Sequence, residues 1–306
     1  MRKHMKRILF LTAWLTAFTA IAQQVPHYTQ FMYNMNVVNP AYAGIKNGFA
    51  GGLLYRTQWA GAEGHPRSFT LNLHSRLGER AGVGLAAIAD RYAFTDQTDI
   101  MLQYSYTLPL TSALNLAMGL NVGVGRDFID LTQAQAVHPA DPLIKSAPDR
   151  VVPTYGLGLM LYSEKFYVSL SAPNLNQAPY KSPNFQWNKG RTLHYFGAAG
   201  YVFDISDNFK IKPHVMVYKA NGSPVSTMLN TNFFLYDMVE IGASYRIKDA
   251  VSGLINVNIN DYIRIGYAYD RTLSSMKLYS PNTHEVFLNF LIPYTGKTAV
   301  MSPLYF

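Results

Sequence analysis

The chain has 306 residues and no cysteine, which excludes disulfides, thiolate metal sites and a cysteine nucleophile. Charged residues make up only 14% of it, its formal charge is +8, and 22 residues are tyrosine, which collects at membrane–water interfaces. Beyond the N-terminal stretch no run of about 18 consecutive apolar residues occurs, so membrane-spanning helices are excluded. The composition leaves a soluble all-β protein or an outer-membrane β-barrel.

The first residues have the pattern of a signal peptide. Four basic residues precede the apolar run Ile8–Ile21, and Ala20-Ile21-Ala22 is a small-residue cleavage site. We predict that residues 1–22 are removed after Ala22, because the apolar run is too short for the alternative, a membrane anchor. The removed segment carries four basic and no acidic residues, so the formal charge falls from +8 to +4. The remaining charge gives no case for nucleic-acid binding.

The next segment, residues 23–47, is rich in aromatic residues and asparagine and has no clean periodicity. It contains the turn-forming pair Asn39-Pro40, followed by Gly44. We expect this N-terminal segment to be ordered and either to plug the lumen of a barrel or to cap its periplasmic rim. In the first case its amide side chains would pair with a polar lumen while its aromatic rings pack against small residues.

Residues 48–292 fall into segments of about ten residues, most of which alternate apolar and polar side chains. In the clearest example, Ile255 and Val257 alternate with Asn256 and Asn258. Successive side chains of a strand point to opposite faces, so each such strand has one apolar and one polar face. The predicted strands number fourteen and cover residues 48–59, 65–76, 81–91, 97–108, 113–126, 153–162, 165–172, 192–203, 208–220, 225–236, 238–248, 252–260, 261–272 and 283–292.

Connection lengths distinguish a membrane barrel from a soluble sandwich. The even-numbered connections are tight, whereas the odd-numbered ones include the long Asp127–Val152, Pro173–Arg191 and Leu273–Asn282. Short turns at one rim and long loops at the other are typical of transmembrane barrels, with the short turns in the periplasm. We therefore predict an all-β fold, a transmembrane antiparallel β-barrel of about fourteen strands in the outer membrane. Residues 23–306 form this single domain, and residues 293–306 are its C-terminal tail.

No group of residues has the spacing of a catalytic or metal site. The eight histidines include no pair at the spacing of helical metal ligands. An outer-membrane lipase would need serine and histidine on the lipid face, whereas His74, His194 and His214 fall on polar faces. Gly119, in a glycine-rich pattern like a nucleotide fingerprint, lies on an alternating segment, which favours a lumen-facing position or a close approach of strands. We predict a non-enzymatic protein with no cofactor and no metal.

The N-terminal segment also carries a resemblance to a known family. Its sequences QFMYN and NPAYAG resemble the N-terminal motif of the PorP/SprF family, outer-membrane proteins of the type IX secretion and gliding motility machinery. The motif residues are Gln30, Phe31, Tyr33, Asn34, Asn39, Pro40, Tyr42 and Gly44. The resemblance extends from Gln24 to about Ile292. It implies a fourteen-stranded barrel without catalytic activity that serves the secretion or surface anchoring of a partner protein, such as a large adhesin with a C-terminal sorting domain.

Two functions remain open at this point. The first is the support of type IX secretion, with outer-membrane lipid, other secretion components and a secreted surface protein as partners. The alternative is a general or specific porin, which the polar faces of the strands favour. For the first function, the loop at residues 173–191 is a candidate partner contact, because exposed aromatic and arginine side chains are typical of interface hot spots. Its candidate contact residues are Tyr180, Phe185, Trp187 and Arg191. A solvated loop with incidental aromatic residues is the alternative interpretation.

Overall fold

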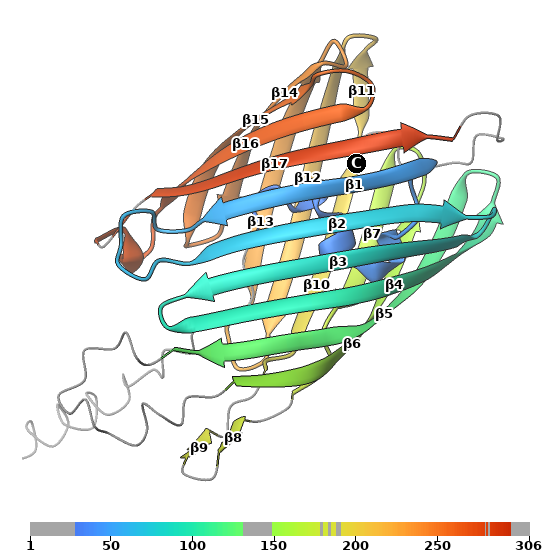
Figure 1. Cartoon of the computed structure of the whole chain (residues 1–306). Coiled ribbons are helices and arrows are strands. Elements are labelled where there is room, and N and C mark those ends of the chain that lie inside the picture. Colours follow the sequence, from blue (N-terminus) through green and yellow to red (C-terminus); the bar gives the residue numbers. More distant parts are fainter. Residues whose placement is uncertain are drawn as a thin grey trace, which may run out of the picture.

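The computed structural model describes residues 28–130, 149–177, 180–182, 185–187, 191–278, 280 and 282–294. The predicted signal peptide lies outside this part of the chain, as do residues 295–306 of the predicted tail. Within it, antiparallel strands close into a barrel (Figure 1). The first strand, β1 (Gly48–Thr57), pairs with the last, β17 (Asn282–Pro293), along its whole length. Closure gives the backbone N–H and C=O groups of the first and last strands hydrogen-bond partners. A bilayer requires this because lipid offers no such partner.

The barrel has fourteen strands, and each pairs with its neighbours in chain order. Two short strands, β10 and β11, are consecutive parts of one of them: both pair with β12, and they are separated at Val202. The strands between the first and the last are β2 (Arg67–Leu77), β3 (Ala81–Tyr92), β4 (Thr95–Thr111), β5 (Leu114–Ile129), β6 (Asp149–Tyr162), β7 (Phe166–Ala172), β10 (His194–Tyr201), β11 (Phe203–Ser206), β12 (Phe209–Ala220), β13 (Ser226–Leu235), β14 (Val239–Arg246), β15 (Ala250–Asn258) and β16 (Ile263–Thr272).

The predicted strands correspond one to one to the observed ones, and the predicted sorting of connections is also observed. The strand ends joined by connections 130–148 and 173–193 lie at one rim, here called the external rim. The opposite rim, here called the periplasmic rim, has only turns of a few residues. Outside the barrel wall, β8 (Tyr180–Ser182) and β9 (Phe185–Trp187) pair as a separate hairpin in the second of these connections (Figure 1).

The predicted bounds of one loop were wrong at both ends. Residues 127–152 were expected to be a loop, but β5 and β6 extend into this range and remain paired there. Ion pairs between the two strands support the extension: Arg126 contacts Asp149 at 2.8 Å, and Arg150 contacts Asp127 at 2.9 Å. These charged residues interrupt the apolar alternation, which is why the pattern hid the strand ends. The strands therefore continue past the region where apolar side chains face outward.

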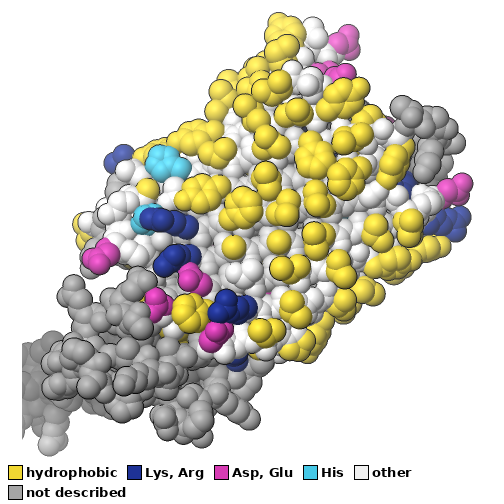
Figure 2. All heavy atoms as spheres, viewed as in Figure 1, with side chains coloured by type: hydrophobic (Ala, Val, Ile, Leu, Met, Phe, Trp, Pro, Cys, Tyr) yellow, Lys and Arg dark blue, Asp and Glu magenta, His cyan; other side chains and the backbone are white. Residues whose placement is uncertain are grey.

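The two faces of the wall differ sharply in polarity. On the outside, Leu102 of β4 and Val122 of β5 are paired, and 63% and 52% of their surfaces are exposed. The next pair on the same strands, Gln103 and Asn121, points inward and is buried. Figure 2 shows the result: apolar side chains cover the middle of the outer face, and charged side chains gather toward the ends of the strands. An apolar outer band of this kind is the surface that faces lipid.

The helices are short and most of them lie inside the barrel (Figure 1). In the described ranges they are η1 (Phe31–Tyr33), α2 (Met35–Val38), η2 (Pro40–Tyr42) and, at the external rim, η4 (Ser275–Leu278). In the described part of the chain, no helix has the length and apolar character needed to cross a membrane. The stretch Tyr28–Ile45, here called the plug, is buried at every residue. Residues 28–45 of the predicted N-terminal segment therefore fill the lumen rather than capping the rim.

Candidate functional site: the plugged lumen

The plug passes through the lumen from its external half to the periplasmic rim. At its start, Thr29 contacts Arg56, which lies next to the external end of β1. At its end, the carbonyl of Gly44 accepts a hydrogen bond from Arg76, next to the periplasmic end of β2. The chain then turns at the rim and enters β1. Along this path, three groups of contacts attach the plug to the wall.

The upper group consists of charged side chains around Thr29. The backbone N–H groups of Thr29 and Gln30 both donate to the carboxylate of Glu285, at 2.9 and 2.7 Å. The hydroxyl of Thr29 donates to the carboxylate of Asp270 at 2.7 Å. Arg56 bridges the two acids, with ion pairs of 2.9 Å to Glu285 and 2.8 Å to Asp270. All these side chains are almost completely buried, so the group is a compensated charge cluster inside the lumen.

The middle group is centred on Tyr33. Its hydroxyl donates to Glu240 of β14 and accepts from the ammonium of Lys212 on β12 at 3.0 Å. Lys212 also pairs directly with Glu240 at 2.7 Å and lies 5.3 Å from the centre of the Tyr33 ring. Lys212 and Glu240 are both buried. A tyrosine hydroxyl can donate and accept at once, so it completes an ion pair that would otherwise have unsatisfied groups in the lumen.

The lower group is organised by Asn39. Its side-chain oxygen accepts from the backbone N–H of Ala41 and so caps η2, whose first residue is Pro40. Its amide nitrogen donates to the carbonyl of Leu159 at 2.9 Å and to the hydroxyl of Ser169 at 2.7 Å. One side chain thus shapes the plug and fixes it to β6 and β7. This dual use explains why an asparagine precedes the proline in the NPAYAG sequence.

Glycines in the wall make room for this lower part. A Cβ atom at Gly82, Gly119 or Gly158 would collide with the plug, at Ala43, Ala41 and Asn39 respectively. The plug's own Gly44 has a φ of 72°, a conformation that favours glycine. Gly119 therefore faces the lumen, one of the two positions that the alternation indicated, and its close neighbour is the plug rather than another strand.

The structure places the predicted site residues in two different environments. All eight residues of the N-terminal motif lie in the buried plug. In the candidate contact loop, Tyr180 begins β8, and Phe185 and Trp187 bound β9, in the hairpin outside the barrel wall. Arg191 differs from the exposed position expected for it: it is buried and pairs with Asp127 at 2.7 Å and with Asp99. It anchors the end of the loop to the wall.

Sequence reasoning missed the charged residues that hold the plug. Their signal was present, because Arg56, Glu240 and Asp270 occupy inward positions on strands whose outward neighbours are apolar. A water-filled lumen would also carry polar and charged side chains, so this signal alone did not identify the plug. The three buried histidines His74, His194 and His214 do lie on inward faces, as predicted. In the described residues, no group of metal-ligating side chains is close enough to hold a metal ion.

A closed barrel with an apolar outer band and an occupied lumen defines an outer-membrane β-barrel protein. The sequence profile of PorP/SprF, the type IX secretion system membrane proteins, matches residues 20–290. The chain therefore belongs to the PorP/SprF family, which confirms the resemblance of its N-terminal motif. The family consists of membrane proteins of the type IX secretion system, and the location of this chain is the outer membrane.

No curated protein matches the chain. Among solved structures, it is similar to the Acinetobacter baumannii outer membrane protein Omp33, with 10% identity, 81% of this chain and 100% of that chain covered, and a TM-score of 0.46. The CymD monoaromatic hydrocarbon channel is 13% identical, with 90% and 95% covered and a TM-score of 0.47. The P. putida toluene transporter TodX is 12% identical, with 85% and 94% covered and a TM-score of 0.47.

The upper charge cluster predicts a large effect of Arg56→Met. The change leaves Glu285 and part of Asp270 buried without their main counter-charge, so we expect the free energy of unfolding to fall by about 3–5 kcal/mol. Urea unfolding of the protein in detergent micelles measures this loss. The matched control is Arg126→Met, which removes an exposed ion pair with Asp149 and should change little. Equal losses in the two variants would contradict the role of the cluster.

The close contact between the wall glycines and the lower part of the plug leads us to predict that Gly119→Ala displaces the plug. The new methyl group meets the backbone of Ala41, so we expect a loss of about 1–3 kcal/mol and faster hydrogen exchange in the plug. Gly253→Ala is the control, because a Cβ atom at that position has nothing within 4 Å. Hydrogen exchange read by mass spectrometry compares the two variants. Unchanged exchange of the plug in Gly119→Ala would refute the close contact.

Proposed function

We propose that this protein is a non-enzymatic outer-membrane barrel that supports the type IX secretion or surface anchoring of a partner protein, such as a large adhesin with a C-terminal sorting domain. The single observation that carries the proposal is the plug. The lumen is occupied by the protein's own chain. It is held by hydrogen bonds of Thr29 and Tyr33 to ion-paired side chains of the wall and by the amide of Asn39. A barrel filled in this way offers its rims and loops, not its interior, to other molecules.

The plug weighs against the alternative of a porin. A diffusing solute would have to displace a segment that is buried at every residue and bonded to strands on opposite sides of the barrel. The hydrogen bonds that Thr29 and Tyr33 donate to buried carboxylates of the wall would be lost at the same time, which is unfavourable because those charged groups stay buried. The polar lumen that made a channel plausible is explained by the plug, because its polar backbone and side chains need polar partners.

The external hairpin is the part of the molecule that we propose contacts the secreted partner. It contains Tyr180, Phe185 and Trp187, and aromatic residues of this kind are enriched in interface hot spots. Arg191 has a different role in this proposal. Its ion pairs with Asp99 and Asp127 fix the base of the loop to the wall, so that the hairpin is presented from a rigid position.

Deleting the gene tests the secretion role. We expect one large surface protein to disappear from the cell surface, as measured by comparing surface and secreted proteomes with and without the gene. The wild-type gene should restore it, whereas a variant with residues 178–190 exchanged for a Gly-Ser linker should not. The control exchanges the external loop at residues 221–225. An unchanged surface proteome would refute the secretion role, and restoration by the hairpin exchange would refute the contact.

Single-channel recording tests the alternative. We expect the intact protein in a planar bilayer to show no steady conductance, because the plug blocks the lumen. Arg56→Met should produce intermittent openings, since it weakens the attachment of the plug at Thr29 and Glu285. Arg126→Met, which lies outside the lumen, should stay silent. Steady conductance of the intact protein would support a porin instead.

A further inference from the structure

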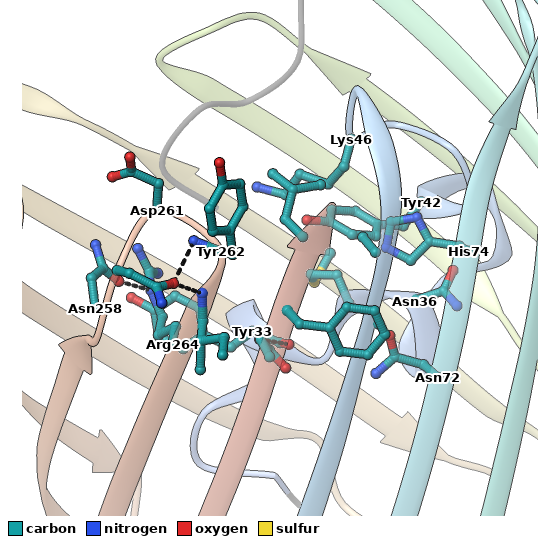
Figure 3. A pocket seen from close by; sticks show the side chains of 18 of the residues that line it. Tyr33, Asn36, Tyr42, Lys46, Asn72, His74, Asn258, Asp261, Tyr262 and Arg264 are labelled. Atoms are coloured by element: carbon teal, nitrogen blue, oxygen red, sulfur yellow. Dashed lines mark hydrogen bonds between the residues drawn. The ribbon is translucent and has the colours of Figure 1, made fainter. Parts of the chain in front are cut away.

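Several basic side chains inside the lumen are engaged by the protein itself. Arg56 and Lys212 pair with buried carboxylates of the wall. Nearer the periplasmic rim, the guanidinium of Arg264 lies 5.0 Å from the centre of the Tyr33 ring, and its Nε donates to Asn258 at 2.6 Å (Figure 3). These cations hold the plug and the wall together. Two arginines on the outer face of the barrel have a different environment.

A groove of about 380 Å³ lies on the outer face of strands β1 to β5, next to the external rim. Two rows of outward-facing side chains line it. In the row nearer the middle of the barrel, Tyr55 of β1 is paired with Phe69 of β2, and both are exposed. In the row nearer the rim, Arg67 of β2 is paired directly with Arg91 of β3, and both are exposed. Charged side chains thus follow apolar ones toward this end of the strands (Figure 2).

This order places the two arginines at the height of the lipid headgroups. Aromatic side chains of transmembrane barrels form girdles where the hydrocarbon core of the bilayer ends. Tyr55 and Phe69 have this position at the external end of the apolar band. Arg67 and Arg91 lie two residues beyond that row, about 7 Å further along the strands. The outer leaflet of an outer membrane consists largely of lipopolysaccharide, and the phosphates of its lipid A lie at this level.

The direct pairing of Arg67 with Arg91 favours an anion between them. Like charges directly opposite each other on neighbouring strands are destabilising. Arg91 has an exposed ion pair of 3.3 Å between its Nε and Asp96, a kind of contact that contributes little. Arg67 donates from its Nε to His65 at 3.1 Å, and in the part of the chain that the structure describes no carboxylate lies at ion-pair distance from it. The pair therefore carries a net positive charge.

A third arginine that lines the groove, Arg126, is already compensated. Its Nε and one terminal nitrogen each donate to the carboxylate of Asp149 at 2.8 Å. Its guanidinium also lies 5.4 Å from the centre of the Phe128 ring. The uncompensated positive charge of the groove is therefore concentrated at Arg67 and Arg91.

We propose that this groove binds lipid A of the outer leaflet through one of its phosphates. Arg67 and Arg91 contact the phosphate together, since a guanidinium presents parallel N–H donors that match phosphate oxygens. Both arginines use Nε for their contacts within the protein, which leaves their terminal nitrogens for the lipid. The acyl chains lie against the apolar band beside Tyr55 and Phe69. This site is additional to the secretion role, and either can fail without the other.

Native mass spectrometry of the full chain in detergent micelles tests the site. The probes are lipid A, lipid A without its phosphates, and inorganic phosphate as a competitor. We expect lipid A to bind at least about ten-fold more tightly than the dephosphorylated form, because the latter lacks the charge-assisted hydrogen bonds. Inorganic phosphate at the same concentration should not displace lipid A. Equal affinity for the two lipids would overturn the proposal, and displacement by inorganic phosphate would assign the groove to a free anion instead.

Matched variants connect the binding to the named residues. Arg67→Gln, and separately Arg91→Gln, should each weaken the binding of lipid A about ten-fold and leave the binding of the dephosphorylated lipid unchanged. Arg271→Gln is the control, because Arg271 is exposed near the external end of β16, outside the groove. Far-UV circular dichroism and heat-modifiable gel mobility show that each variant is folded. Full affinity in either groove variant, or an equal loss in Arg271→Gln, would overturn the proposal.

Discussion

The hydrogen bonds between β1 and β17 are the interaction on which the rest of the structure depends. In lipid, an open strand edge would leave unpaired N–H and C=O groups, each costing several kcal/mol, so the sheet must close on itself. Closing fourteen strands encloses more space than the inward side chains of the wall can fill. That space must then hold water, a ligand or protein. Here it holds the stretch of chain that immediately precedes the first strand.

Filling a lumen with protein brings a further requirement, because the plug has few regular hydrogen bonds of its own. Its N–H and C=O groups are satisfied by side chains of the wall, such as Glu285 at Thr29 and Arg76 at Gly44. Buried ion pairs of this kind contribute little net stability compared with apolar packing. They do select one position of the plug, because a shift along the lumen would break the hydrogen bonds between its polar groups and the charged side chains of the wall. The charges in the lumen are best understood as determinants of register.

Much of this architecture could be predicted from the sequence. Alternation such as that at Ile255 and Asn256 identified the strands and their faces. One face of each strand contacts lipid and the other contacts the polar lumen, so apolar and polar side chains alternate. The position of the plug was harder to predict. Its side chains pack against all sides of the lumen, so its apolar and polar residues show no regular spacing. Its contacts join residues very far apart: Thr29 and Glu285 are separated by 256 positions. The burial of Arg191 could not be predicted from a pattern. A loop residue has no periodic inward and outward positions, so its burial depends on the part of the wall that it contacts.

The place of the plug in the chain order has a consequence for assembly. The plug precedes β1, yet it lies inside a barrel that closes only when β1 meets β17. Once the seam has formed, no lateral opening remains, and the plug can then enter only along the axis of the lumen. Thr29 and Gln30 bind Glu285, a residue of the last strand to be synthesised, so the two ends of the domain recognise each other late in folding. Contacts of such long sequence separation form slowly. Because Glu285 belongs to the strand that closes the barrel, the seating of the plug and the closure of the wall depend on the same strand.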